Sequence, residues 1–466
     1  MYASVRIKSE KNKIDMLNGP IFIRVVAFTV PLILSSVLQL LFNSADVVVL
    51  GRFAGDYSMA AVGCTTSLVH LFLNFFMGLS VGANVCVARY CGADRKKDAG
   101  EAVHTAMGMA LICGIILTLV GIFTSRKMLE LMDTPENVID LADLYLKIYF
   151  LAMTGVLIYN YGSAILRAIG DTKRPLYFLF IAGIINVILN LIFVICLKMD
   201  VMGVGLATLI SEYISAILVV ICLIKEKSVV HLSIKKIRVY GDKLKEMLMV
   251  GLPAGLQGTV FALSNVVIQS SINIFGGIVV AGDSAAKNIE GFVYVSMNAV
   301  SQATISFVSQ NYGAGNKERI KRIFFSSEGF VILIGIVLGN LAYIFASPLL
   351  SIYTQNPEAI KAGIVRMSVI CTTYCLCGIM DVLVGALRGI GYSVIPMVVS
   401  LIGACGLRLV WIATVFKIER FHSPFTVYLS YPISWILTSL VHLITFIVLY
   451  KKLNFKTYKT KQEVLS

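Results

Sequence analysis

Long apolar runs separated by short polar segments make up most of this chain of 466 residues. An α-helix needs about 20 apolar residues to cross the hydrocarbon core of a bilayer, and longer runs are typical of tilted helices. The pattern predicts an all-α integral membrane protein with twelve transmembrane helices. They are expected at residues 24–50, 58–88, 99–124, 139–166, 175–198, 203–224, 246–273, 282–310, 323–346, 362–387, 396–417 and 425–450.

Composition and charge support this fold class. Hydrophobic residues make up 58% of the chain and charged residues 14%, whereas soluble domains have about 45–50% and about 25%. The net charge of +14 comes from basic residues between the apolar runs, where orientation signals belong. This placement argues against a nucleic-acid partner and makes the lipid bilayer the expected surrounding.

The basic residues also predict an orientation. Both tails and every second loop hold 29 of the 40 Lys and Arg residues, while the opposite loops hold 7 and the spans 4. By the positive-inside rule, both termini face the cytoplasm. We expect a multi-pass protein of the plasma (cytoplasmic) membrane.

The second half of the chain repeats the first at a shift of about 221 residues. LRAIGDTKRP (166–175) aligns with LRGIGYSVIP (387–396), and Pro31 aligns with Pro253 after a slip of one residue. Each half has six spans, so the halves are parallel repeats. The expected parts are a cytoplasmic segment at 1–23, a six-helix lobe at 24–224, a cytoplasmic linker at 225–245, a second lobe at 246–450 and a basic tail at 451–466.

Polar side chains recur along the first predicted span, in and before LFNSADVVVLGRFAG (41–55). Gln39, Asn43 and Asp46 follow Ser35 at spacings that place all four on one helical face. An acid at the centre of a spanning helix costs about 2.5–3.5 kcal/mol on insertion scales, so it is expected to face the bundle interior or a wet cavity.

The fifth and sixth predicted spans carry matching polar groups. These are Asn186, Asn190, Thr208, Ser211, Glu212 and Ser215. Together with the first span they predict a small hydrated chamber in which Asp46 binds a proton or a hard cation such as Na⁺. The alternative, that these groups only hold the helices together, stays open.

A second intramembrane acid, Asp381, lies in CGIMDVLVGALRGIG (377–391), and its repeat partner is Asn160. We expect Asp381, Asn160 and Gln39 at a substrate or second-ion site. The sequence has no G-x-x-x-x-G-K-[ST] loop and no His/Glu or Cys/His metal spacing, and its cysteines mostly lie in apolar runs. It therefore predicts no cofactor, no metal centre and no enzyme activity.

Several motifs together resemble those of the multidrug and toxic compound extrusion (MATE) family. They are LFNSADVVVLGRFAG, YCGADRKK with NYGAGNKE, LRAIGDTKRP with ALRGIGYSVIP, and INVILNLIFV followed by MGVGLATLISEYISA. The resemblance implies the two-lobe fold of the MOP superfamily. It also implies antiport of organic, often cationic compounds against inward H⁺ or Na⁺ flow.

The resemblance also implies site residues. Asp46, Asn186, Asn190 and Thr208 match the N-lobe cation site of DinF-like members, although Asn190 stands where that pattern has a second acid. Asp381 matches a C-lobe acid of NorM-like members, whose partner on the seventh helix has no counterpart here. The chain thus mixes the two patterns.

These observations predict a secondary active multidrug exporter that works by alternating access of two lobes, as a monomer, on small-molecule drugs or metabolites. The coupling site would comprise Asp46, Asn43, Asn186, Asn190, Thr208 and Glu212. An alternative is a flippase for lipid-linked oligosaccharide, which would need intramembrane cations to hold pyrophosphate. The spans offer only Lys147, Lys287, Arg366 and Arg408.

Overall fold

The computed structural model describes residues 13–453. These residues are helical almost throughout, with no strand among them, as the apolar pattern predicts. They form two compact units, which are described separately. Unit 1 contains residues 13–15, Ala27–Cys91 and Arg95–Thr259, and unit 2 contains Met16–Val26, Gly92–Asp94 and residues 260–453.

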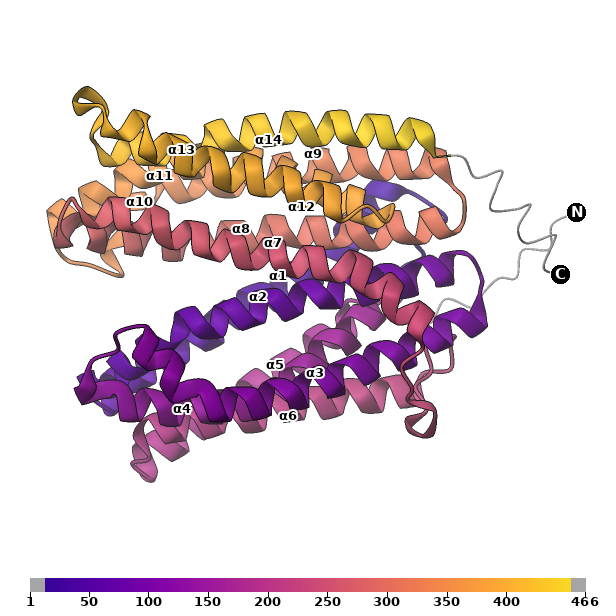
Figure 1. Ribbon diagram of the computed structural model, residues 1–466, viewed down its shortest axis with the longest axis horizontal. Coiled ribbons are helices and arrows are strands. Elements are labelled where there is room, and N and C mark those ends of the chain that lie inside the picture. Colours follow the sequence, from indigo (N-terminus) through magenta and orange to yellow (C-terminus); the bar gives the residue numbers. More distant parts are fainter. Residues whose placement is uncertain (1–12, 454–466) are drawn as a thin grey trace, which may run out of the picture. The chain divides into compact units, whose positions relative to one another are not determined.

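Unit 1 is a bundle of long helices (Figure 1). Its elements are α1 (Ile21–Phe53), α2 (Asp56–Gly92), α3 (Lys96–Leu131), α4 (Glu136–Ala168), α5 (Lys173–Asn190), the π-helical turn η1 (Leu191–Cys196), α6 (Asp200–Lys225), the 3₁₀ turn η2 (Ile234–Lys236) and the first part of α7 (Gly241–Asn273). The first residues of α1 belong to unit 2.

Unit 2 is also helical and contains the rest of α7. Its further elements are α8 (Gly277–Gly313), α9 (Lys317–Ile344), α10 (Ala346–Ser351), α11 (Pro357–Gly389), α12 (Val394–Ser400), the π-helical turn η3 (Leu401–Gly406), α13 (Leu407–Ala413), the 3₁₀ turns η4 (Val415–Lys417) and η5 (Glu419–Phe421), and α14 (Pro424–Lys452). The predicted eleventh span corresponds to α12, η3 and α13 in succession.

Within residues 13–453, eleven helical runs are long and apolar enough to cross a membrane. The long helix α8, with 37 residues, is not among them and carries Asp283, Lys287 and Glu290 in its first half. The eleven runs and α8 correspond to the twelve predicted spans.

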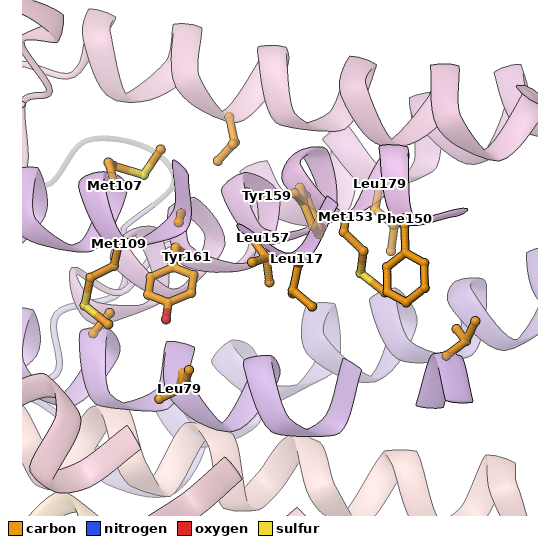
Figure 2. Packing of buried hydrophobic residues seen from close by; sticks show 14 of the residues in the cluster. Leu79, Met107, Met109, Leu117, Phe150, Met153, Leu157, Tyr159, Tyr161 and Leu179 are labelled. Carbon is orange, nitrogen blue, oxygen red and sulfur yellow. The ribbon is translucent and has the colours of Figure 1, made fainter. Parts of the chain in front are cut away.

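The core of unit 1 is built on α4, which packs against both α3 and α6. Figure 2 shows buried side chains of this core, including Leu79, Leu117, Phe150 and Leu157. Phe150 also meets Phe72 of α2 edge to face, with ring centroids 5.4 Å apart. Apolar side chains from α2, α3 and α4 thus fill the interior of this unit, as expected for helices hydrophobic on several sides.

The first part of α7 is held in unit 1 by small residues. A Cβ on Gly78 of α2 would collide with the backbone of Gly255, and a Cβ on Gly251 would collide with that of Leu79. Such close backbone approach is typical of membrane helices with small residues four positions apart. The predicted lobe boundary at residue 246 follows the sequence repeat, whereas the compact units divide inside α7, after Thr259.

The linker after α6 is ordered against α3. The backbone N–H of Ser233 donates to Nε2 of His104 at 3.1 Å, and that of Tyr240 donates to Oγ1 of Thr105 at 3.2 Å. Leu232 is buried, with 1% of its surface exposed. The linker is therefore part of unit 1 rather than a solvated connector.

A buried carboxylate fastens the segment before α1 to unit 1. Glu226 accepts hydrogen bonds from Nζ of Lys13 at 2.6 Å and from Nη2 of Arg174 at 2.7 Å, and its side chain is only 1% exposed. Burial raises the pKa of Glu226, but the hydrogen bonds and charges of Lys13 and Arg174 outweigh it and lower the pKa to about 2.

Glu226→Gln is expected to destabilise the protein at pH 7 by about 1–3 kcal/mol, because Lys13 and Arg174 lose the negative charge of this shared partner, although Arg174 keeps its ion pair with Asp171. Glu226 stabilises the fold fully above its ordinary pKa of 4.5, and this contribution is lost as the pH falls through the folded-state pKa of about 2. The difference in apparent Tm between wild type and variant should therefore shrink below pH 4.5. Thermal denaturation of the detergent-purified protein across pH tests this. A pH-independent difference would contradict it.

Candidate functional site

Asp46 lies in α1 and is held by a side chain from α5. Its Oδ1 accepts a hydrogen bond from Nδ2 of Asn190 at 2.5 Å. Asn190 is fully buried, and a hydrogen bond to an ionised group contributes about 1.5–3 kcal/mol. The structure thus brings together the acid and the amide that the sequence assigns to one site.

The hydrogen bonds continue from Asn190 along α5 to α6. Nδ2 of Asn190 also donates to Oδ1 of Asn186 at 3.1 Å, because residues four apart share one helical face. Nδ2 of Asn186 in turn lies 3.5 Å from Oγ1 of Thr208 and 3.5 Å from Oγ of Ser211. Four residues on α5 and α6 therefore form one chain of polar groups that ends at Asp46.

Asp46, Asn186, Thr208 and Ser211 border a small cavity in unit 1, and Asn190 lies behind Asp46 and Asn186, bonded to both. The lining residues of the cavity are Gln39, Phe42, Asn43, Asp46, Leu179, Ala182, Gly183, Asn186, Thr208, Ser211, Glu212 and Ser215. The cavity measures about 60 Å³, which is room for a few water molecules, whereas drug-sized ligands occupy pockets of about 300–1,000 Å³. The site therefore suits an ion with its water and is too small for an organic cargo.

Glu212 places a second carboxylate on the cavity wall, on α6 and one residue after Ser211. The π-helical turn η1 begins directly after Asn190, and such turns are often found at functional sites. Ser35 differs from the rest of its stripe, because its Oγ donates to the backbone oxygen of Pro31 at 2.9 Å. Ser35 is not among the residues that line the cavity.

The donor atoms of the site are carboxylate, amide and hydroxyl oxygens, which suit a proton or a hard cation. Asn190 has a buried Oδ1 that accepts no hydrogen bond within residues 13–453. The described part of the chain contains no group of three or more His, Cys, Asp and Glu residues arranged to hold a metal ion.

The residues of the predicted second site lie in different units. Asp381 lies on α11 in unit 2, where Oδ2 is buried without a hydrogen-bond partner among the described residues. Asn160 lies on α4 in unit 1, and its Nδ2 donates to the backbone oxygen of Val156 in the same helix at 2.9 Å. Gln39 lines the cavity with Asp46 instead.

Unit 2 contains a buried ion cluster that the sequence interpretation missed. Arg366 of α11 donates through Nε and Nη2 to Glu290 at 2.9 and 2.8 Å, and through Nη1 to Asp283 at 2.9 Å. Nζ of Lys287 lies 3.1 Å from Oδ2 of Asp283. The spacing of Asp283, Lys287 and Glu290 on one face of α8 was the available signal.

Comparison with known proteins identifies the family. The family model MatE matches residues 31–192 and again residues 253–414, so it covers both repeats. The probable multidrug resistance protein YpnP of Bacillus subtilis (strain 168) is 28% identical over 396 residues, covering 84% of this chain and 88% of that protein. The probable multidrug resistance protein NorM of Thermotoga maritima is 25% identical and covers 82% of this chain and 83% of its own length.

A solved structure shares the fold. An outward-facing multidrug resistance MATE family transporter of the MOP superfamily superposes with a TM-score of 0.88 at 21% identity, covering 95% of this chain and all of that one. This likeness confirms the predicted all-α, two-lobe membrane fold. With both repeats matched by the family model, the chain belongs to the MatE family of multi-pass membrane transporters.

Proposed function

We propose that this transporter is a secondary active multidrug exporter, which moves cationic or amphipathic organic compounds outward in exchange for inward H⁺ or Na⁺. The relatives named above as multidrug resistance proteins support the cargo class. The observation that carries the coupling is the carboxylate of Asp46, bonded to Asn190 at the edge of an ion-sized cavity.

The hydrogen-bond chain suggests how the proton changes the site. With Asp46 ionised, the amides of Asn190 and Asn186 point their N–H groups along the chain in one direction. Side-chain amides can be turned over when their partners change. A protonated Asp46 donates to the carbonyl oxygen of Asn190, and turning both amides lets Thr208 donate to Asn186, while Ser211 keeps its hydrogen bond to the backbone oxygen of Thr208. The hydrogen bonds of the site thus differ between the two protonation states, and the Oδ1 of Asn190 gains a donor only when Asp46 is protonated.

The energetics allow this exchange. With an uncharged cargo, one charge moving inward gains about 2.3 kcal/mol per 100 mV of membrane potential, and a tenfold cargo gradient requires about 1.4 kcal/mol. When a cargo with one positive charge leaves for one H⁺ or Na⁺, the two charges cancel, and the concentration gradient of the ion drives the exchange with about 1.4 kcal/mol per tenfold ratio. In this scheme the two lobes alternate access to the plasma membrane's two sides, both termini face the cytoplasm and the protein is a monomer. Asp381 remains our candidate for binding substrate or a second ion.

The flippase alternative loses support from the charges of the spans. Lys147 lies 2.7 Å from Asp143, and Lys287 and Arg366 are paired in the cluster on α8 and α11. Three of the four intramembrane cations considered above are thus neutralised by carboxylates. A pyrophosphate group would have to break these pairs, so drug export is the better-supported function.

Asp46→Asn is expected to reduce ethidium efflux about tenfold or more and to remove its dependence on the proton or Na⁺ gradient, because the amide cannot exchange a proton. Efflux from proteoliposomes with pH and Na⁺ gradients imposed separately measures this. Glu358→Gln, which removes an exposed acid at the start of α11, is the matched control and should transport normally. Gradient-dependent efflux at the wild-type rate by Asp46→Asn would contradict the proposal.

Asn190→Asp is expected to make thermal stability respond to Na⁺. The new carboxylate would stand within hydrogen-bond distance of Asp46, and a bound cation relieves the repulsion between like charges. Saturating Na⁺ should raise the apparent Tm of this variant by about 2–4 °C relative to K⁺ or choline at equal ionic strength. Asn316→Asp, an exposed amide just before α9, is the control. Equal responses of the two variants would show that Asn190 does not border a cation site.

A further inference from the structure

Arg408 is a buried cation that has no carboxylate partner among the described residues. It lies in α13, immediately after the π-helical turn η3, and is 4% exposed. Its Nε donates to Oγ of Ser434 on α14 at 2.8 Å. Within residues 13–453 the guanidinium of Arg408 makes this one hydrogen bond, through Nε.

Aromatic rings surround this guanidinium. Its Cζ lies 4.2 Å from the ring centroid of Tyr431 and 5.6 Å from that of Trp435. Tyr374 of α11 packs edge to face on Trp435, with centroids 5.5 Å apart. The rings stabilise the cation from its faces, but they offer no acceptor for its remaining N–H groups.

The sequence repeat relates this place to the ion site of unit 1. The two MatE matches, 31–192 and 253–414, are offset by 222 residues. Arg408 lies 222 positions after Asn186, and Ser434 lies 223 positions after Ser211. The bond from Arg408 to Ser434 joins α13 to α14 as the contact from Asn186 to Ser211 joins α5 to α6. Tyr431 corresponds in the same way to Thr208.

The two related places differ in charge. The residue 222 positions after Asp46 is Ile268 of α7, which is buried at 2% exposure. Unit 2 therefore lacks the acid of α1 and has a cation where unit 1 has a neutral amide. The nearby cation Arg366, also over the ring of Tyr431 at 5.8 Å, is already bonded to Glu290 and Asp283.

We propose that Arg408, with Tyr431 and Trp435, forms a binding site for the carboxylate group of an organic cargo. A carboxylate presents two coplanar oxygens that match two N–H groups of a guanidinium, and a flat ring system next to it stacks on the aromatic side chains. A buried arginine without an anion is unfavourable, so such a ligand would supply the missing partner. The site rests on the export function proposed above and assigns to Arg408 the recognition of a cargo's carboxylate.

The test compares two dyes that differ only at one group. Rhodamine B has a carboxylate, and its ethyl ester does not. Binding of each dye to the full-length protein in detergent is measured by fluorescence anisotropy. We expect wild type to bind the acid about tenfold more tightly than the ester, and Arg408→Gln to lose this preference while ester affinity stays within about twofold. Arg408→Lys should keep part of the preference, and Arg420→Gln, an exposed arginine of the same unit, should keep all of it.

Several outcomes would overturn the proposal. They are equal binding of the two dyes by wild type, binding of neither, and equal weakening of both by Arg408→Gln. If Arg408→Gln does not fold, the wild-type protein is instead modified with phenylglyoxal, and the modified arginines are mapped by mass spectrometry. Rhodamine B, but not its ethyl ester, should then protect Arg408 from modification. Because binding is measured without gradients, Asp46→Asn should leave the acid-to-ester ratio unchanged. The binding assay can therefore contradict the Arg408 site without contradicting ion-coupled efflux, and the efflux assay can contradict ion coupling without contradicting the Arg408 site.

Discussion

An ionisable side chain inside a membrane-spanning helix must find polar partners on the neighbouring helices, because hydrocarbon offers none. Asp46 of α1 meets this requirement through Asn190 of α5, which in turn depends on Asn186 and on the hydroxyl groups of α6. The polar chain therefore determines how three helices of unit 1 face one another. In an apolar bundle packing alone would fix which faces of the helices meet, whereas this bundle also has a defined polar interior.

The two units solve the same problem with different residues. Unit 1 keeps one hydrogen-bonded acid beside an ion-sized cavity, while unit 2 neutralises Arg366 directly with Glu290 and Asp283. The two repeats share their helices but not their charged positions, because Ile268 of unit 2 corresponds to Asp46 of unit 1. A duplicated fold thus provides two separate polar environments in one chain, and each can serve a different ligand.

Much of this architecture could be predicted from the sequence. Apolar length predicts the spans, and four-residue spacing places Asn186 and Asn190 on one face with the acid of α1. Pairing between distant helices was harder to predict, because no local pattern shows that Glu290 would meet Arg366. The boundary between the two units could not be predicted either. The sequence repeat divides the chain before α7, whereas close packing at Gly251 and Gly255 places the first part of α7 in unit 1. The π-helical turn before Arg408 leaves no sequence pattern that we can identify.

The helix α7 begins in unit 1 and ends in unit 2. A break introduced in the linker before it would separate the two sequence repeats but would leave the amino-terminal fragment without the helix that covers Gly78. That fragment would expose a strip of backbone suited to another small-residue helix. The amino-terminal half is therefore expected to need the first part of α7 in order to fold.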